Sequence, residues 1–490
     1  EQPEAKLANA CLIWYNSFVQ FIKGLKVVFM EIKIFNFGPI KEFGIDLSRD
    51  LIVIYGKNNI GKSYAISVVY LLLKHFLSID RFQLEKLIAE ELDNKEYQAI
   101  EKQIREEKER DITGQVSLII KNILNNVLAE KLENSFKNTF GQLNAIKNVN
   151  AKESPLIQLA ILNHAIRIEV EKNIQLKEFS AGRAIFGKIP GDGKYSFEIT
   201  KDRYNLLIGT DKVFNEFLRA SVSEIIFKML SDMENEFGQI YFLPASRSGL
   251  YTGMQSLIPL FADLSKNRAY TTRKIELPAM TEHIADYILH LSEIKGIPNE
   301  NKELNSIVST IEKEILGGEI GFDEDKTKLT YSPIGSGLTL DMNFVSSMVS
   351  ELSPFAAFIK FILQEGTSSS HNMAKPIIFI EEPEAHLHPQ AQILLAEIFV
   401  KLVKAGIKII VTSHSNYIFN KIGNMLLART LSPGEFAPIV LKNTNDGSIS
   451  RLMEADELGI EDENFIDTSD ALYQERETII DRLNNASDDR

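Results

Sequence analysis

The stretch Leu51-Ile52-Val53-Ile54-Tyr55-Gly56-Lys57-Asn58-Asn59-Ile60-Gly61-Lys62-Ser63 decides the fold of this chain. Its first five residues are apolar and mostly β-branched, which is typical of a strand buried on both faces of a parallel sheet. The next eight match the pattern G-x-x-x-x-G-K-S, and a helical pattern follows Ser63 to about His75. A strand, a glycine-rich loop and a helix in this order predict a phosphate-binding loop.

The loop also indicates which groups would hold a nucleotide. Its candidate binding residues are Gly56, Lys57, Asn58, Asn59, Ile60, Gly61, Lys62 and Ser63. Their backbone N–H groups and the positive helix N-terminus converge on one anion, and the two glycines remove Cβ atoms that would intrude. Lys62, a candidate catalytic residue, supplies charge to the β and γ phosphates, and Ser63 offers its hydroxyl to magnesium. We therefore expect ATP and Mg²⁺ as cofactors.

A second apolar strand pattern ends in two acids. Residues 377–380 are apolar, and Glu381 and Glu382 follow at the C-terminal end, where open α/β sheets bind ligands. We predict that Glu381 lies at the magnesium ion, behind its direct ligands. Glu382 is predicted to be the catalytic residue that aligns or deprotonates the attacking water. The plainer alternative is an exposed acidic strand end, which the pairing with the phosphate loop disfavours.

Three histidines follow these acids. His414 ends the next predicted strand, 32 residues after Glu382, and we predict that it reaches the γ-phosphate across the sheet edge as a third catalytic residue. His386 and His388 form an H-x-H pattern, but a zinc site needs three or four ligands in fixed geometry, and the chain has one cysteine. We favour a loop in which these two histidines contact a partner or cap the next helix.

The remaining pattern predicts an α/β fold with a mainly parallel central sheet, an antiparallel β subdomain and an inserted helical region. The last third alternates strands and helices: strand 377–381, helix 389–404, strand 407–412, helix 416–428 and strand 437–441. Residues 81–140 read as two helices that are broken near 111–114, residues 165–208 as a small antiparallel sheet, and residues 346–364 as a helix.

This pattern divides the chain into five predicted segments. They are an N-terminal extension (1–29), the first part of a split head with the phosphate loop (30–80), a helical and β insertion (81–236), the second part of the head (237–450) and a helical tail (451–490). Residues 7–29 are apolar but carry too many polar side chains to span a bilayer. We expect the working fold to begin near Met30, because a strand-like run, residues 30–35, starts there.

Composition limits the classes of function. The 490 residues carry 54 Lys plus Arg against 67 Asp plus Glu, a formal charge of -13, so the chain as a whole is not a polybasic wrapper of nucleic acid or lipid. A local basic groove stays open as an alternative. One cysteine, Cys11, excludes an internal disulfide framework and indicates a reducing compartment. We expect a cytoplasmic protein with no membrane partner.

Three segments carry a family resemblance: residues 32–63 around the phosphate loop, residues 376–392 (PIIFIEEPEAHLHPQAQ) and residues 409–415 (IIVTSHS). Together they resemble P-loop ATPases of the ABC/SMC superclass. Within it they are most similar to RecF-like and OLD-like AAA family ATPases, of the kind found in bacterial anti-phage systems such as Septu and retron-associated systems. The resemblance implies an ABC-type ATPase head that forms a homodimer, or a higher oligomer, around ATP.

In such families a signature serine at a helix N-terminus faces the nucleotide of the partner. The best match here is Ser346 and Ser347, although Met348 stands where the family usually has glycine. The superclass also usually has Asp where Glu381 stands, and the extra methylene leads us to expect slow hydrolysis. Arg247 lies in a segment similar to one in OLD-like heads and is a candidate phosphate or interface contact.

Three hypotheses of function follow. The first is an ATPase that controls a separate effector such as a nuclease in anti-phage defence. The effector is expected to be separate because the tail is too short for the nuclease module of OLD-family enzymes. The second is a RecF-like DNA repair or recombination clamp on duplex DNA, with binding that falls steeply with salt. The third is a nucleotide-gated interaction module without turnover. Nucleic acid therefore stays open as a partner.

Overall fold

A computed structural model gives the structure of the chain in twelve segments. It describes residues 30–92, 109–162, 164–181, 184–188, 195–199, 202–204, 213–266, 280–298, 301–324, 328–363, 374–460 and 473–480. The predicted N-terminal extension lies outside the described residues. Of the predicted C-terminal helix, residues 473–480 are described and are helical.

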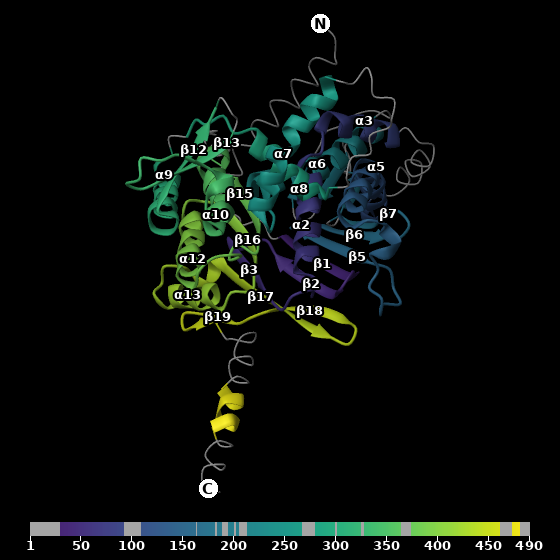
Figure 1. Ribbon diagram of the computed structural model, residues 1–490. Helices are drawn as coiled ribbons and strands as arrows, with labels where there is room; N and C mark the ends of the chain where they lie inside the picture. The colour runs from purple at the N-terminus through teal and green to yellow at the C-terminus, as the bar shows by residue number, and fades with distance from the viewer. Residues whose placement is uncertain are drawn as a thin grey trace.

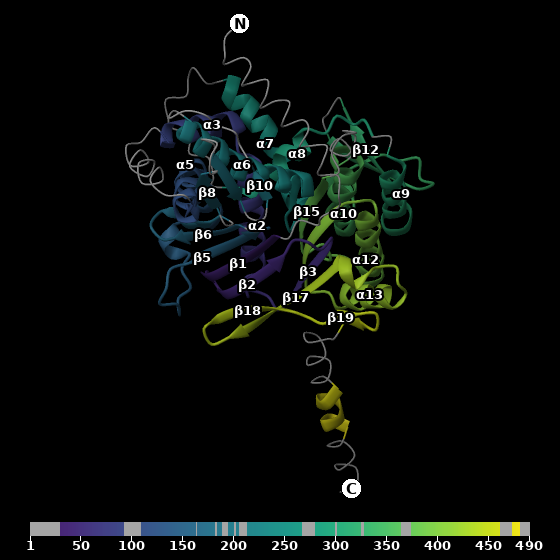
Figure 2. The same ribbon diagram turned by 180° about the vertical axis from the view of Figure 1, so that it is seen from behind.

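A large mixed sheet forms the centre of the molecule (Figures 1 and 2). Its strand order is β11 (Phe237–Leu243), β15 (Lys375–Glu381), β16 (Lys408–Ser413), β3 (Leu51–Tyr55), β17 (Phe436–Thr444), β18 (Gly447–Leu452), β2 (Ile40–Asp46), β1 (Met30–Phe37), β5 (Leu156–Ile161), β6 (His164–Val170) and β7 (Ile174–Ser180). The first five strands in this order run parallel to one another. Antiparallel pairing begins at β17 and β18 and dominates the other half.

Helices cover both faces of the parallel half (Figure 1). The α-helices are α2 (Lys62–Leu77), α3 (Arg81–Leu92), α5 (Thr113–Phe140), α6 (Val213–Glu236), α7 (Arg247–Lys266), α8 (Glu282–Ser292), α9 (Lys302–Thr310), α10 (Ser347–Ala357), α12 (Pro389–Lys404) and α13 (Asn416–Leu427). Shorter helical turns are η1 (Leu143–Ala145), η3 (Ile311–Leu316), η4 (Met342–Phe344), η5 (Phe358–Ile362) and η6 (Pro433–Glu435). Within the described residues, every helix is too short or too polar to act as a membrane span.

Strand β3 shows why this arrangement follows from the sequence. All five of its residues are fully buried. Alternate side chains point to opposite faces of a strand, so Leu51, Val53 and Tyr55 join the hydrophobic core beneath α10, α12 and α13. Ile52 and Ile54 join the second core, beneath α2, α5 and α6. The apolar run therefore places β3 in the middle of the sheet, with one core on each side.

The predicted fold class is confirmed, with one correction to the antiparallel part. Residues 165–208 were expected to form one small antiparallel sheet, but β6 and β7 extend the central sheet through β5. The separate antiparallel sheet instead has the order β10 (Asp202–Tyr204), β9 (Tyr195–Ile199), β8 (Ala184–Lys188) and β4 (Glu109–Asp111). The reason is pairing with β1, whose free edge accepts β5 from Met30 to Phe35. Strand β5 lies about 120 residues after β1 in the chain, so no local sequence pattern predicts that the two strands pair.

Two smaller sheets complete the described fold. One has the strand order β12 (Gly318–Asp323), β13 (Lys328–Pro333) and β14 (Leu340–Asp341), and it lies beside α10 in Figure 1. The other pairs β19 (Ala455–Asp456) with β20 (Gly459–Ile460). The predicted break between two helices near 111–114 is confirmed, since α5 begins at Thr113 after β4. The predicted division of the chain into five segments stays a prediction.

The register of the parallel strands brings the motif residues to one edge. Glu381 at the end of β15 pairs with Thr412 of β16, and Ser413 of β16 pairs with Tyr55 at the end of β3. The C-terminal ends of three adjacent strands therefore lead directly into the phosphate loop, the acidic pair and His414. Ligand sites of open α/β sheets occur at this edge.

Candidate active site

The loop after β3 adopts a tight turn that depends on its glycines. Gly56 has a φ of 146° and Gly61 a φ of 100°, values that side-chain-bearing residues rarely adopt. A Cβ on Gly56 would lie 2.4 Å from Ile60 Cδ1 and 2.9 Å from the Leu441 carbonyl oxygen. Both distances are too short for non-bonded atoms. The glycines of the predicted motif are therefore required for the loop to close over the end of β3.

Helix α2 begins at Lys62 and presents a free N-terminus to this loop. Its N-cap residue is Gly61, which has no side chain to accept from the first N–H groups, and no acidic residue lies in the first turn. The orphan N–H groups and the partial positive charge of the helix dipole therefore remain available to an anion. Lys57, Asn58 and Asn59 are exposed at the rim, whereas Ile60 is buried beneath them.

The Lys62 side chain folds back over the loop. Its Nζ donates to the carbonyl oxygens of Gly56 and Lys57, at 2.9 Å each, and the residue is only 5% exposed. Burial lowers the pKa of Lys62 to about 8, against the opposing effect of the nearby Glu382 and Glu384 charges. The ammonium is thus held at the loop with little solvation, and a polyanion would restore the stabilisation that water supplies elsewhere.

Glu381 and Ser63 meet between β15 and α2. The Ser63 hydroxyl donates to the Glu381 carboxylate, which also accepts from the backbone N–H of Ala245 at 3.4 Å. Burial is the largest effect on Glu381 and raises its pKa above the ordinary value. A hydroxyl and a carboxylate in contact are the oxygen donors that magnesium prefers, so the two predicted metal residues fit such an ion. The predicted metal position is consistent with this pairing.

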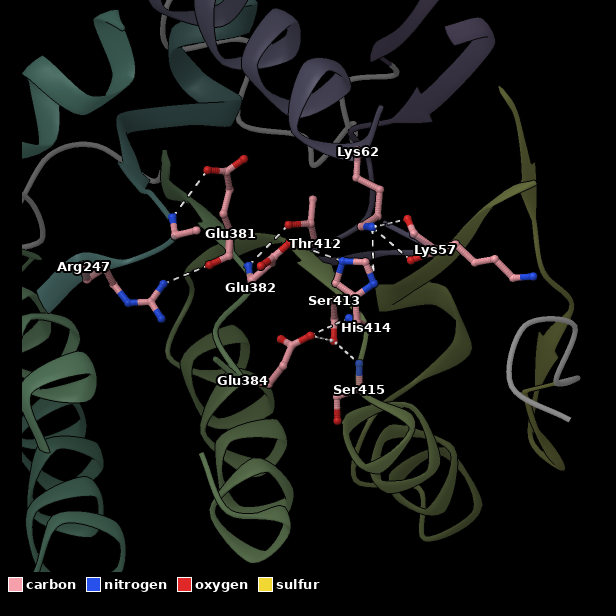
Figure 3. Close-up of polar contacts among 12 residues, drawn as sticks. Lys57, Lys62, Arg247, Glu381, Glu382, Glu384, Thr412, Ser413, His414 and Ser415 are labelled. Carbon is pink, nitrogen blue, oxygen red and sulfur yellow. Dashed lines mark hydrogen bonds and ion pairs between the residues drawn. The ribbon is translucent and has the colours of Figure 1, made fainter. Parts of the chain in front are cut away.

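Glu382 and His414 face each other across β15 and β16 (Figure 3). His414 Nε2 lies 3.2 Å from Glu382 Oε1, and His414 Nδ1 lies 3.5 Å from Lys62 Nζ. The hydrogen bond from His414 is the main reason that the pKa of Glu382 lies below its ordinary value. Glu382 also has a φ of 41°, a strained value for a glutamate, which its backbone hydrogen bond to Thr412 holds in place. Of the three predicted catalytic residues, His414 therefore contacts both of the others.

Glu384 is a site residue to which the sequence analysis gave no role. Its Oε1 accepts from the Ser413 hydroxyl at 2.9 Å and from the backbone N–H of His414, so it fixes the segment that carries the imidazole. The only sequence signal was a third acid two residues after Glu382, and nothing local connected it to His414. In Figure 3 the Glu384 carboxylate lies beneath the His414 ring.

These residues line an open cavity of about 450 Å³. Its walls are Lys57, Asn58, Glu382, Glu384, Ala385 and His414. One wall is the rim of the phosphate loop, and the opposite wall is formed by the loops that follow β15 and β16. The cavity therefore lies where a terminal phosphate on the loop would meet Glu382 and His414.

Ser346 and Ser347 lie elsewhere, at the start of α10. They are exposed and are not among the cavity-lining residues of the same chain. Ser346 is the N-cap of α10 and accepts from the Val349 N–H at 3.4 Å, so the predicted helix start is confirmed. No acidic residue lies in the first turn of this helix. Contact between these serines and a nucleotide would require a second chain, as the resemblance implies.

Arg247 corrects a sequence prediction. We expected a phosphate or interface contact, but the side chain is 1% exposed, and its Nη1 donates to the Glu381 carbonyl oxygen at 2.9 Å. Its Nη2 lies 3.1 Å from Glu351 Oε1 in α10, a carboxylate that is fully buried. Glu351 in turn accepts from the backbone N–H groups of Arg247 and Ser248. The pair joins the helix of the signature serines to the strand of the acidic pair.

The histidines of the H-x-H pattern behave as predicted in part. His388 is the N-cap of α12, where its Nδ1 accepts from the Gln390 N–H at 3.3 Å. His386 is exposed and has a φ of 62°. Within the part of the chain that the structure describes, no three His, Cys, Asp or Glu side chains gather as a self-contained metal site. The capping prediction is confirmed for His388, and partner contact by His386 stays a prediction.

Comparison with known proteins places these residues in a family. The family model AAA_15, described as "AAA ATPase domain", matches residues 30–419. This range contains the loop, both acids and His414. None of the curated protein sequences matches the chain.

Solved structures of SMC heads are similar to the chain at low identity. An SmcHead bound to the C-winged helix domain of ScpA has 12% identity and a TM-score of 0.38, covering 87% of this chain and 97% of its own. The SMC head domain from Thermotoga maritima has 10% identity and a TM-score of 0.34, and the match covers 87% of this chain and 99% of that one. The Smc head domain derived from Pyrococcus furiosus, with an extended coiled coil and bound to the C-terminal domain of ScpA, has 11% identity and a TM-score of 0.36. The match covers 92% of this chain and 100% of that one.

Proposed function

This chain belongs to the AAA_15 family of AAA ATPase domains, and we propose that it binds ATP with magnesium, hydrolyses it slowly, and uses the cycle to control a separate effector protein. The observation that carries the proposal is the meeting of three motifs at one sheet edge. The phosphate loop follows β3, the acidic pair lies at the end of β15, and His414 follows β16, although the loop lies more than 300 residues before the other two motifs in the chain.

The loop would hold the phosphates through backbone and charge. The free N–H groups of α2 would donate to the β-phosphate, and Lys62 would turn its ammonium from the two loop carbonyls toward the β and γ oxygens. Magnesium, held by Ser63 with Glu381 behind it, would neutralise charge on the same oxygens. The partly desolvated Lys62 interacts more strongly with a polyanion than an exposed lysine would.

Glu382 and His414 would act at the γ-phosphate. Lysine has no acceptor atom, so the contact from Lys62 assigns the lone pair to His414 Nδ1 and the proton to Nε2, which donates to Glu382. When phosphate takes the Lys62 contact, the ring can turn its single N–H, on Nε2, from Glu382 to a γ oxygen. Glu382 then aligns the attacking water. Its lowered pKa makes it a weak base, which fits slow turnover.

The exposed serines support a dimer as part of the proposal. Ser346 and Ser347 lie at a helix N-terminus that carries no acidic residue, which suits a phosphate brought by a second copy. Such a homodimer would sandwich two nucleotides. We further propose that the dimer is cytoplasmic and controls an effector such as a nuclease in anti-phage defence, in line with the resemblance of the three motifs.

One experiment separates effector control from a DNA clamp. The Glu382→Gln variant keeps the loop but loses the carboxylate, so it should bind ATP and stay in the ATP-bound dimer. Purified from its native host with ATP, it should retain a stoichiometric second protein that Lys62→Ala does not retain. Duplex DNA in place of that protein, released by salt, would favour the RecF-like clamp. A Glu382→Gln variant that hydrolyses ATP at the parent rate would refute the assigned base.

A further inference from the structure

An exposed aromatic ring lies directly beside the phosphate loop and has no part in the chemistry described above. Tyr64 follows Ser63 in the first turn of α2 and is 38% exposed. Side chains of a helix tilt toward its N-terminus, so this ring leans toward the end of α2 at which phosphate would bind.

The ring is held in place by an aromatic cluster. Tyr64 packs against Phe140 at the end of α5, with ring centroids 5.2 Å apart and an interplanar angle of 34°. Phe140 is in turn fixed edge-on by Phe37 at 5.1 Å and by Phe136 at 5.5 Å, and both of these are buried. The cluster joins the phosphate-loop helix, β1 and the insertion helix α5. Tyr64 is therefore held in place by Phe140 while remaining 38% exposed.

The turn between β1 and β2 leaves room for the Tyr64 ring only because Gly38, which lies in this turn, has no side chain. A Cβ on Gly38 would lie 2.8 Å from Tyr64 Cε1. The same turn touches the last glycine of the loop, where a Cβ on Gly61 would lie 2.9 Å from Pro39 Cγ. The aromatic surface and the phosphate loop are therefore direct neighbours on the β1–β2 side.

The direction of a bound nucleotide follows from the two ends of the loop. Glu382, Glu384 and His414 line the cavity on the side of β15 and β16, so the γ-phosphate points there. In a nucleoside triphosphate, the base lies at the opposite end of the nucleotide from the γ-phosphate. It must leave the loop away from these residues, and the β1–β2 turn with Tyr64 lies on the other side of α2, next to Gly61.

We propose that Tyr64, backed by Phe140, is the platform on which the nucleotide base stacks. The inference deepens the proposed function and rests on it, because it names the part of the site that takes the base. Stacking on an aromatic face depends on ring area rather than on a hydrogen-bond pattern, so the platform favours purines over pyrimidines and discriminates weakly between adenine and guanine.

The test compares two ligands that differ by the nucleoside and are not hydrolysed. ADP carries the base, and inorganic pyrophosphate carries only the phosphates. Tyr64→Ala should weaken ADP binding about 5- to 150-fold, as expected for loss of one base stack, and should leave pyrophosphate binding unchanged. Tyr64→Phe should bind ADP as the parent does. Phe82→Ala, which removes a 79% exposed aromatic from the first turn of α3, is the matched control.

Each outcome decides a separate question. Equal ADP affinity in Tyr64→Ala and the parent overturns the platform while leaving the proposed function intact. Equal losses for ADP and pyrophosphate also overturn it, because Tyr64 would then only support the loop. A loss in Tyr64→Phe that matches Tyr64→Ala assigns the effect to the hydroxyl and not to stacking. A parent protein that binds neither ligand refutes the proposed function itself.

Discussion

His414 Nε2 lies 3.2 Å from Glu382 Oε1, so the residue that follows β16 restrains the residue that follows β15. The contact extends to Lys62 through the other ring nitrogen, at 3.5 Å. A phosphate that draws Lys62 away therefore also removes one of the two contacts that fix the His414 ring. The proposed base and the phosphate-binding lysine are linked through one imidazole, which lets the arrival of nucleotide release Glu382 for its task.

The two neighbouring lysines of the loop should differ sharply on replacement. Lys62→Ala removes a buried ammonium that sits over the loop, and we expect loss of detectable ATP binding by calorimetry with the fold retained. Lys57→Ala removes an exposed lysine at the rim and should weaken binding by less than about tenfold, because solvent screens its charge. Equal losses in the two variants would contradict the role given to Lys62.

ATP affinity should depend on pH through Lys62. Its pKa is lowered to about 8, so the ammonium is charged below that pH and increasingly neutral above it. Phosphate favours the charged form and raises this pKa in the complex, so binding above pH 8 takes up a proton. Affinity should begin to fall as the pH approaches 8 and should approach a tenfold loss per pH unit near pH 9 and above.

Calorimetry in buffers of different ionisation enthalpy measures this proton uptake directly. Near pH 9 it should approach one proton per ATP bound, and it should fall to about a quarter of a proton at pH 7.5. An affinity that stays constant to pH 10 would show that Lys62 keeps its ordinary pKa in the free protein.

Breaking the buried pair of Arg247 and Glu351 should destabilise the fold strongly. Arg247→Met leaves the Glu351 carboxylate buried without its charge partner, and we expect a loss of about 3–5 kcal/mol in the free energy of unfolding. Arg429→Met breaks an arginine–glutamate pair whose side chains are 79% and 69% exposed and should cost about 0–1 kcal/mol. Urea denaturation of both variants measures the difference, and similar midpoints would be evidence against a structural role for the buried pair.

Magnesium removal should separate binding from turnover. EDTA should abolish ATP hydrolysis, because the charge on the γ-phosphate is then unscreened. Ser63→Ala should raise the magnesium concentration needed for half-maximal hydrolysis, as measured by phosphate release. Ser78→Ala, at the opposite end of α2, should leave that concentration unchanged. A Ser63→Ala variant with the parent's magnesium dependence would remove Ser63 from the metal site.

The sequence predicted the parts of the site that depend on local pattern. The phosphate loop, the acidic pair and His414 each follow a short apolar run, and parallel strands bring such ends together. The pairing of Arg247 with Glu351 could not be found in this way, because 104 residues separate the two and no local pattern connects them. The same holds for β5, whose pairing with β1 is a long-range choice. Patterns give the ends of strands, whereas the partners of buried charges are set by tertiary packing.

The position of β3 has a consequence for how the chain is made. Both of its neighbours in the sheet, β16 and β17, are encoded about 350 residues after it. A ribosome adds about 5–20 residues per second, so the phosphate loop waits on the order of 20–70 s for the strands that support it. During synthesis its five apolar residues have no sheet to join, and they are a natural target for chaperones. Nascent chains that stop before β16 should therefore lack a working nucleotide site, however complete their first motif.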